Sequence, residues 1–156
     1  METKEIKSLV EAKKTLAHQE TIPLITFYLG DILFGIYAEK VMEINKDLEI
    51  TPVPLSDSYI LGIMNLRGQI LTVIDLAKKI NFQIETRPKL NLIVRNQDEA
   101  VSFLIERISD IMEVPVVKLE EPPEKIEGLD KEYVEKIYQL PDRLLIVLDV
   151  AKLFAN

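Results

Sequence analysis

The chain has 156 residues, of which 47% are hydrophobic and 29% charged, and its formal net charge is −7. This composition supports the core of one compact domain or of two small fused subdomains and excludes global disorder. The acidic balance argues against nucleic acid as the main partner, because binding to phosphate backbones depends on clustered cations. The absence of cysteine excludes disulfides, thiolate nucleophiles and cysteine-bound zinc.

The N-terminal segment has its own pattern. Residues 3–18 place Ile6, Leu9 and Val10 on one side at helical spacing, which predicts a short amphipathic helix. We expect residues 1–20 to be an extension that is helical or partly disordered. Its interspersed charges are unlike a secretory signal, and the aliphatic runs of the chain are too short to cross a bilayer, so we expect a cytoplasmic protein. The single histidine, His18, has no partner set and is expected to be an exposed residue.

From residue 24 onward, short aliphatic and aromatic runs alternate with turn residues, a pattern that predicts strands. The expected strands are Leu24–Leu29, Ile32–Tyr37, Val41–Ile44, Ile60–Leu66, Ile70–Leu76, Leu90–Arg95, Ala100–Ile105, Ile108–Val114, Ile137–Leu140 and Leu144–Val150. A short extended piece is expected at residues 50–53 and a turn or short helix at residues 77–80. So many strands with so little helix between them indicate an all-β barrel or sandwich.

The run YILGIMNLRGQILTVIDL, from Tyr59 to Leu76, places two apolar segments around the break Arg67-Gly68-Gln69. Gly68 adopts positive φ without steric cost, so we predict a hairpin corner there. Arg67 is a permanent cation at the tip of an apolar hairpin, and taken alone it reads as a solvated turn residue. Apolar side chains between Ile70 and Ile74 point to both sides of the strand. Both faces are therefore expected to be buried, one in a core and the other against a sister element or a partner.

The chain contains an internal repeat, because residues 63–78 (IMNLRGQILTVIDLAK) align with residues 137–152 (IYQLPDRLLIVLDVAK). The matched landmarks are Tyr59 with Tyr133, Leu66 with Leu140, and Asp75 with Asp149. The alignment predicts two copies of one small β unit, at about residues 24–80 and 90–154. Each copy is too small to bury a good core alone, so we expect the copies to pack closely and to leave a groove at their junction.

The two copies differ at their hairpins. The turn Arg67-Gly68-Gln69 of the first copy becomes Pro141-Asp142-Arg143 in the second, and Gly62 becomes Lys136. Only the first copy carries the combination of Gly, Leu, Arg and Gly. An asymmetry inside a duplicated scaffold is the place where a specialised surface is expected.

The sequence offers little for catalysis. No Ser/His/Asp order can be built around a histidine in the extension, and the five glycines are spread singly, without a phosphate-binding loop. Asp75 and Asp149 are conceivable as paired carboxylates, but their equivalent positions at strand ends favour turn or cap residues. The acidic pair Glu120-Glu121 lacks a calcium-binding pattern. We therefore predict a binding module without enzymatic activity, metal or cofactor.

The stretch from Val53 to Leu76, with its Leu-Arg-Gly hairpin, resembles the signature of the CheW family of chemotaxis coupling proteins. The upstream pattern FxLGxxxFGIxxxxVxEI, from Phe27 to Ile44, fits the opening strands of the same family. A weaker match follows in order, over residues 100–115 and 142–153. The resemblance covers about residues 24–154 and implies a single domain of this family over residues 21–156.

The resemblance implies a fold of two intertwined, SH3-like, five-stranded β-barrel subdomains. It also implies a non-enzymatic adaptor that links chemoreceptors (methyl-accepting chemotaxis proteins) to the histidine kinase CheA. In such proteins the cytoplasmic helical tip of the receptor lies in the groove between the subdomains. The kinase joins through its own CheW-like regulatory domain, and the two proteins alternate in rings. Membrane association is then expected only through receptor arrays.

By position, the resemblance assigns receptor coupling to Val41, Glu43, Gly62, Arg67 and Gly68. It assigns the kinase-facing surface to Leu61 and Ile70. We predict an ion pair between Glu43 and Arg67, since a partly buried guanidinium needs an acceptor. Two departures from the family pattern are Glu106, where Asp is frequent, and Lys136, which replaces a glycine and puts the geometry of the last hairpin in doubt.

An alternative from another class is a β-barrel that binds a small ligand or single-stranded nucleic acid. Barrels of that kind need cations and exposed aromatic side chains. An acidic chain with five Tyr and five Phe gives this alternative little support.

Overall fold

The computed structural model describes residues 20–46, 48–126 and 128–155. The helix expected in residues 3–18, and His18, lie outside the described residues. The elements in chain order are β1 (Thr21–Leu29), β2 (Ile32–Tyr37), η1 (Ala38–Lys40), β3 (Val41–Lys46), β4 (Ile60–Leu66), β5 (Gln69–Asp75), α2 (Leu76–Lys79), β6 (Leu90–Asn96), β7 (Glu99–Ile105), β8 (Arg107–Pro115), η2 (Val116–Lys118), η3 (Lys131–Tyr133), β9 (Val134–Gln139), β10 (Leu144–Leu148) and α3 (Val150–Phe154). Each of the ten expected strands is therefore confirmed, with shifts of a few residues at some ends. No helix in the described ranges is long and apolar enough to span a membrane.

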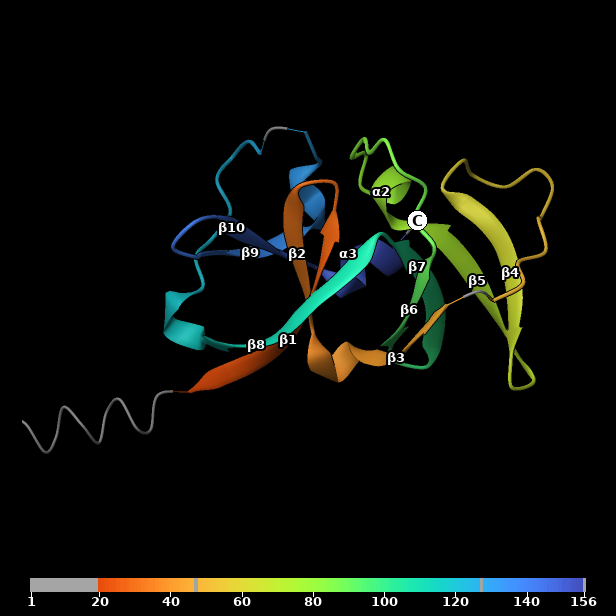
Figure 1. The fold of residues 1–156 in the computed structure, drawn as a ribbon, viewed down its shortest axis with the longest axis horizontal. Coiled ribbons are helices and arrows are strands. Elements are labelled where there is room, and N and C mark those ends of the chain that lie inside the picture. The colour runs from red at the N-terminus through yellow and green to blue at the C-terminus, as the bar shows by residue number, and fades with distance from the viewer. Residues whose placement is uncertain (1–19, 47, 127, 156) are drawn as a thin grey trace, which may run out of the picture.

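The strands form two five-stranded sheets (Figure 1). Sheet one has the order β3-β6-β7-β5-β4, and sheet two has the order β8-β1-β2-β10-β9. The boundaries of the sequence copies, 24–80 and 90–154, do not coincide with these sheets. The first copy sends β1 and β2 into sheet two, where β1 pairs with β8 and β2 runs parallel to β10. The second copy sends β6 and β7 into sheet one, so the two halves of the chain are interleaved.

The repeat is nevertheless visible in the backbone. Each copy ends in an antiparallel hairpin, β4–β5 or β9–β10, followed by one short helix. Each outer edge strand is capped by one isolated bridge, Thr51 with Ile63 in the first copy and Glu120 with Ile137 in the second. Asp75 and Asp149 are the N-caps of α2 and α3, as predicted, with their carboxylates accepting from the backbone N–H groups three residues later.

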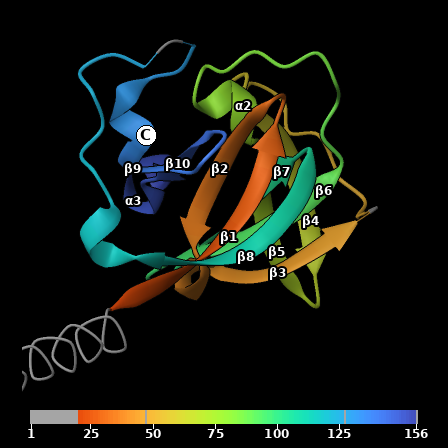
Figure 2. The ribbon, with the colours of Figure 1, turned by 60° about the vertical axis from the view of Figure 1, so that its left-hand side comes forward.

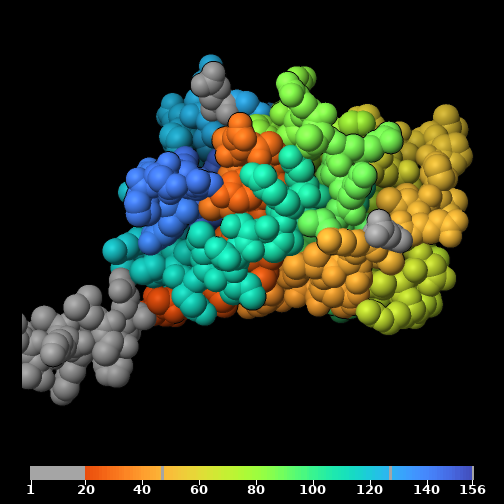
Figure 3. Space-filling model, viewed as in Figure 1, coloured from red at the N-terminus to blue at the C-terminus, as the bar shows by residue number. Residues whose placement is uncertain are grey.

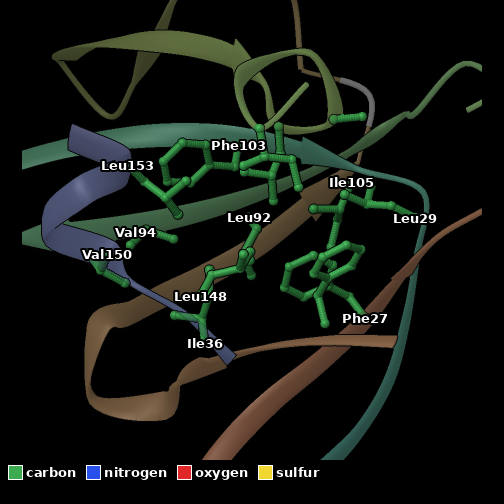
Figure 4. Close-up of a cluster of buried hydrophobic side chains, with 14 of the residues drawn as sticks. Phe27, Leu29, Ile36, Leu92, Val94, Phe103, Ile105, Leu148, Val150 and Leu153 are labelled. Carbon is green, nitrogen blue, oxygen red and sulfur yellow. The ribbon is translucent and has the colours of Figure 1, made fainter. Parts of the chain in front are cut away.

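A central apolar cluster holds the two sheets together, and Figure 4 shows part of it. Sheet two contributes Phe27, Ile36 and Leu148, and sheet one contributes Leu92, Phe103 and Ile105; all six side chains are fully buried. The opposite face of each sheet carries a smaller cluster of its own, around Leu145 in sheet two and around Leu71 in sheet one. Most strands are therefore buried on both faces, which is why their sequences read as continuous apolar runs instead of alternating patterns.

Each sheet has two edge strands, β3 and β4 in sheet one and β8 and β9 in sheet two. Of these, β3 and β8 differ clearly from the inner strands. Within the described chain, β3 pairs only with β6 and β8 pairs only with β1. Both of these strands come to the front of the molecule in Figure 2. Their burial alternates along much of their length, because each has one face toward solvent.

We expect Ile105→Ala to lower the free energy of unfolding by about 3 kcal/mol, because the truncation leaves a cavity in the central cluster. The matched control is Ile111→Ala on β8, where the side chain is 70% exposed and the loss should stay within about 0.5 kcal/mol. Chemical denaturation of both variants measures the difference. Equal losses at the two positions would contradict the assignment of the core.

Candidate functional site

The hairpin that links β4 to β5 turns in two residues, Arg67 and Gly68, since Leu66 pairs directly with Gln69. Both turn residues have positive φ, 50° for Arg67 and 86° for Gly68, as the tight turns that match the twist of a hairpin require. The carboxamide oxygen of Asn65 accepts a hydrogen bond from the Gly68 N–H at 2.8 Å. The hairpin corner at Gly68 is thus confirmed, while Gln69 is the first residue of β5 and not part of the turn.

Arg67 and Glu43 form the predicted ion pair. The Nη1 atom of Arg67 lies 2.6 Å from Oε2 of Glu43, and Nη2 lies 3.1 Å from Oε1, so the pair is bidentate. Asn45, two residues along β3, also donates to Oε1 of Glu43. This ion pair joins the tip of the β4–β5 hairpin to β3. In the strand order of sheet one, β3 lies at one edge and β4 at the other.

The prediction that the guanidinium is partly buried was wrong. The Arg67 side chain is 71% exposed, and that of Glu43 is 23% exposed. An exposed pair is screened by water and salt and adds little to folding stability. Its bidentate geometry instead orients the arginine, and leaves a guanidinium edge accessible on the surface.

Glu43 stays ionised over a wide pH range. Hydrogen bonds from Arg67 and then from Asn45 hold the pKa of the Glu43 carboxyl below its usual value of 4.5. The same contact raises the pKa of Arg67, which is charged in any case. The pair is therefore a stable, permanently charged feature at neutral pH.

Gly62 acts through the backbone of the hairpin. It lies in β4 at a register shift, is buried, and has φ of 153°. A Cβ at this position would lie 2.1 Å from the carbonyl oxygen of Thr51, the residue whose isolated bridge covers the edge of β4. Only glycine allows this approach.

Lys136, at the position equivalent to Gly62, does not disturb the last hairpin. β9 pairs with β10 over five residue pairs, with the register shift at the corresponding place. Lys136 forms an ion pair with Glu121 in the preceding loop. Glu106, the other departure, accepts a hydrogen bond from the Gly30 N–H at 2.7 Å and so supports the β1–β2 turn.

The remaining assigned residues are spread over sheet one. Val41, at the start of β3, is half-buried against the central cluster, and Leu61 is half-buried against the smaller cluster of sheet one. Ile70 is 59% exposed, so the expectation that both faces of its strand are buried fails at this residue and holds from Leu71 onward. Ile70 is thereby available to a partner, which the expectation allowed.

Sequence reasoning missed a group of exposed apolar side chains on the edge strands β3 and β8. Met42 and Ile44 on β3 are 45% and 40% exposed, and Ile111 on β8 is 70% exposed. Atoms of both strands reach the surface on the side that Figure 3 shows. The recurring apolar-Glu-apolar pattern of both strands was visible in the sequence, but their edge positions depend on the pairing of distant segments.

The described ranges hold no group of three or more His, Cys, Asp or Glu side chains that could bind a metal ion. Asp75 and Asp149 serve as helix caps. What the site offers is a charged, oriented arginine at the β4–β5 turn and exposed apolar side chains on β3 and β8.

Comparisons of the sequence and of the structure with known proteins find the same family. A family model described as the CheW-like domain matches residues 23–156. The chain is 32% identical to the chemotaxis protein CheW of Treponema pallidum, over 89% of this chain and 85% of the relative. It is 27% identical to the chemotaxis protein CheW of Helicobacter pylori, over 96% and 95%. The crystal structure of the scaffolding protein TtCheW from Thermoanaerobacter tengcongensis superimposes with a TM-score of 0.81 at 27% identity, covering 88% of this chain and 94% of that one.

We expect Gly62→Ala to destabilise the protein by about 2–3 kcal/mol, because the added methyl forces β4 away from the backbone of Thr51. Gly68→Ala is the matched control: its Cβ would meet open space, and the cost is that of a left-handed residue, about 1 kcal/mol. Denaturation curves give both values. A Gly62→Ala loss no larger than that of Gly68→Ala would contradict the close approach.

The lowered pKa of Glu43 predicts how the contribution of this carboxyl to folding stability depends on pH. A carboxyl whose folded pKa lies below its unfolded value contributes stability above the unfolded value and loses it as pH falls through the folded pKa. Arg67→Ala should raise the Glu43 pKa toward 4.5, measured by NMR titration of the side-chain carboxyl. The internal control is Asp142, whose pKa is lowered by Arg143 and should not change. An unchanged Glu43 pKa would show that Arg67 is not its partner in solution.

Proposed function

This chain belongs to the family of CheW-like domains, and on that premise we propose that it is a non-enzymatic adaptor that couples chemoreceptors to the histidine kinase CheA. The single observation that carries the proposal is the Glu43–Arg67 pair, exposed on the hairpin whose Arg-Gly turn the second copy lacks. Its partners would place the protein in the cytoplasm, with access to the membrane only through receptor arrays. We infer further that each sheet closes into an SH3-like barrel.

The receptor surface in this proposal consists of Arg67, the hairpin corner at Gly68 and the exposed apolar side chains of the edge strands. A receptor tip is a pair of helices, and a helix presents both apolar and charged side chains on one face. Met42, Ile44 and Ile111 supply apolar area for such a face. Arg67, held by Glu43, supplies a cation in a fixed position. Gly62 and Val41 support this surface indirectly. Gly62 allows the close approach of Thr51 to β4, and Val41 packs the start of β3 against the central cluster.

The kinase surface in this proposal lies on the β4–β5 hairpin, with Ile70 as its exposed anchor. Leu61 is half-buried and supports the hairpin against the smaller cluster of sheet one. An isolated exposed isoleucine is ordinary on a protein surface. Ile70 is the stronger candidate because it lies on β5, two residues after Gly68 of the turn that carries Arg67, so the two partner surfaces share one hairpin.

An adaptor of this kind works by differential binding. It transmits a receptor state only if the bound receptor prefers one geometry of the adaptor–kinase complex over another. No bond is made or broken, and the coupling is the difference between two binding free energies. A rigid two-sheet body is suited to this task because it transmits the position of one bound partner to the other.

The test is a pull-down with two baits, a receptor-tip fragment and a CheA regulatory domain. Arg67→Ala should weaken capture by the receptor tip at least 10-fold, because the oriented cation is lost. Ile70→Ser should weaken capture by the kinase domain and leave receptor capture near the parent level. The matched control is Arg87→Ala, an exposed arginine far from the hairpin turn in sequence, which should bind both baits normally. Normal capture by both baits in Arg67→Ala and Ile70→Ser would overturn the assignment.

A charge exchange then separates two roles for Arg67. The double variant Glu43→Arg/Arg67→Glu restores the ion pair with its polarity reversed. If the pair acts only as a brace, the double variant recovers receptor binding. If the guanidinium contacts the receptor directly, as we propose, the double variant stays defective while its fold, followed by circular dichroism, is intact.

A further inference from the structure

Lys79, the last residue of α2, is a buried cation. Lys79 is only 6% exposed. Burial of its ammonium group is costly unless polar groups surround it. Its Nζ atom donates to the carbonyl oxygen of Ala155 at 3.1 Å. It also lies 4.2 Å from the ring centroid of Tyr59 and 5.9 Å from that of Tyr133. Two aromatic faces and a carbonyl therefore surround the charge.

These partners come from different parts of the fold. Tyr59 directly precedes β4 of sheet one, whereas Tyr133 directly precedes β9 of sheet two and Ala155 follows α3. The two tyrosines are equivalents in the repeat. The carbonyl of Tyr59 accepts from the Asp75 N–H at 2.8 Å, and that of Tyr133 accepts from the Asp149 N–H at 2.9 Å. The ammonium of Lys79 thus lies between Tyr59 of the first copy and Tyr133, the equivalent residue of the second copy.

The two residues after Lys79 reach the same segment of the second copy. The carbonyl oxygen of Ile80 accepts from the Asp130 N–H at 3.4 Å. Asn81, in a left-handed conformation with φ of 57°, donates from Nδ2 to Oδ2 of Asp130 at 2.6 Å. Ile80 and Asn81, the two residues after α2, are therefore joined by hydrogen bonds to Asp130, in the segment that leads into β9.

The second copy has no lysine at the position equivalent to Lys79, so the contacts of Lys79 are not a general feature of the repeat. The residue equivalent to Lys79 in the second copy is Leu153, which is 1% exposed and part of the central apolar cluster. Apolar contact between the sheets is non-directional and tolerates small rotations. A hydrogen bond and two ring contacts to one ammonium depend on direction, so they select one orientation of the sheets.

We propose that Lys79 is a positioning residue that, together with Asn81, holds the two sheets at one relative orientation. The consequence for coupling rests on the proposed function: the apolar edge of β8 lies in sheet two, and the Arg67 hairpin lies in sheet one. A receptor that touches both surfaces meets them at a fixed spacing only if the sheets do not rotate against each other. Loss of Lys79 therefore widens the range of orientations before it unfolds either sheet.

The experiment uses the absence of cysteine, which permits specific spin labelling of the full chain. Labels go on Asp31→Cys, in the exposed β1–β2 turn of sheet two, and Asp98→Cys, in the exposed β6–β7 turn of sheet one. Pulsed electron spin resonance then gives the distribution of the distance between the labels. We expect Lys79→Met to broaden this distribution at least twofold. Lys79→Arg, which keeps a cation and a donor, should restore most of the parent width.

Two controls keep the result specific. Lys78→Met makes the same change on the adjacent exposed lysine and should leave the distribution unchanged. If Lys79→Met does not fold, Tyr133→Leu replaces it, with Tyr133→Phe as its matched control, because phenylalanine keeps the ring that faces the ammonium. A folded Lys79→Met or Tyr133→Leu variant with the parent distribution overturns the proposal. So does broadening of equal size in Lys78→Met.

The outcome is separable from that of the proposed function. Label distances are measured on the protein alone, so they do not depend on any partner. If the parent protein captures neither bait, the proposed function fails while the distance result stands. If the parent captures both baits and Lys79→Met has a normal distance distribution, the positioning role fails while the adaptor function stands.

Discussion

The central apolar cluster is the constraint on which the rest of the structure depends. Neither sheet has enough apolar area to form a stable domain alone, and each presents one face to the other. Phe27, Leu148, Phe103 and Ile105 are buried in one shared cluster, and each sheet contains strands from both copies. The interleaved topology makes the two sheets a single unit, since neither can be completed by one half of the chain. The exposed edges β3 and β8 remain at its surface.

On this duplicated frame the two hairpins have diverged. In the first copy, Glu43 of β3 holds Arg67 by a bidentate contact. In the second copy, the Glu43 equivalent, Glu113, accepts a hydrogen bond from Thr21, and Arg143 contacts Tyr28 and Asp142 instead. The same scaffold thus carries one hairpin whose arginine pairs with β3 and is 71% exposed, and one whose arginine contacts Tyr28 and Asp142 and is 43% exposed.

The polar contacts at the end of α2 complement the apolar cluster. The cluster supplies most of the favourable free energy, whereas Lys79 and Asn81 supply direction. Folding stability and orientation are therefore carried by different residues. An exposed pair such as Glu43–Arg67 fits this division as well: it contributes orientation at the surface, where water screening leaves little stability to gain.

The sequence by itself determined the local features of this protein. Apolar runs and turn residues located the ten described strands, the repeat located the two caps at Asp75 and Asp149, and the resemblance to the CheW family pointed to Glu43 as the partner of Arg67. These features depend on neighbours along the chain or on motif position. Only the tertiary structure decided which strands share a sheet, because apolar runs of similar composition pair equally well in many orders. It also decided that Arg67 is exposed, that β3 and β8 are edges, and that Lys79 is buried between Tyr59 and Tyr133, since burial depends on segments far apart in the chain.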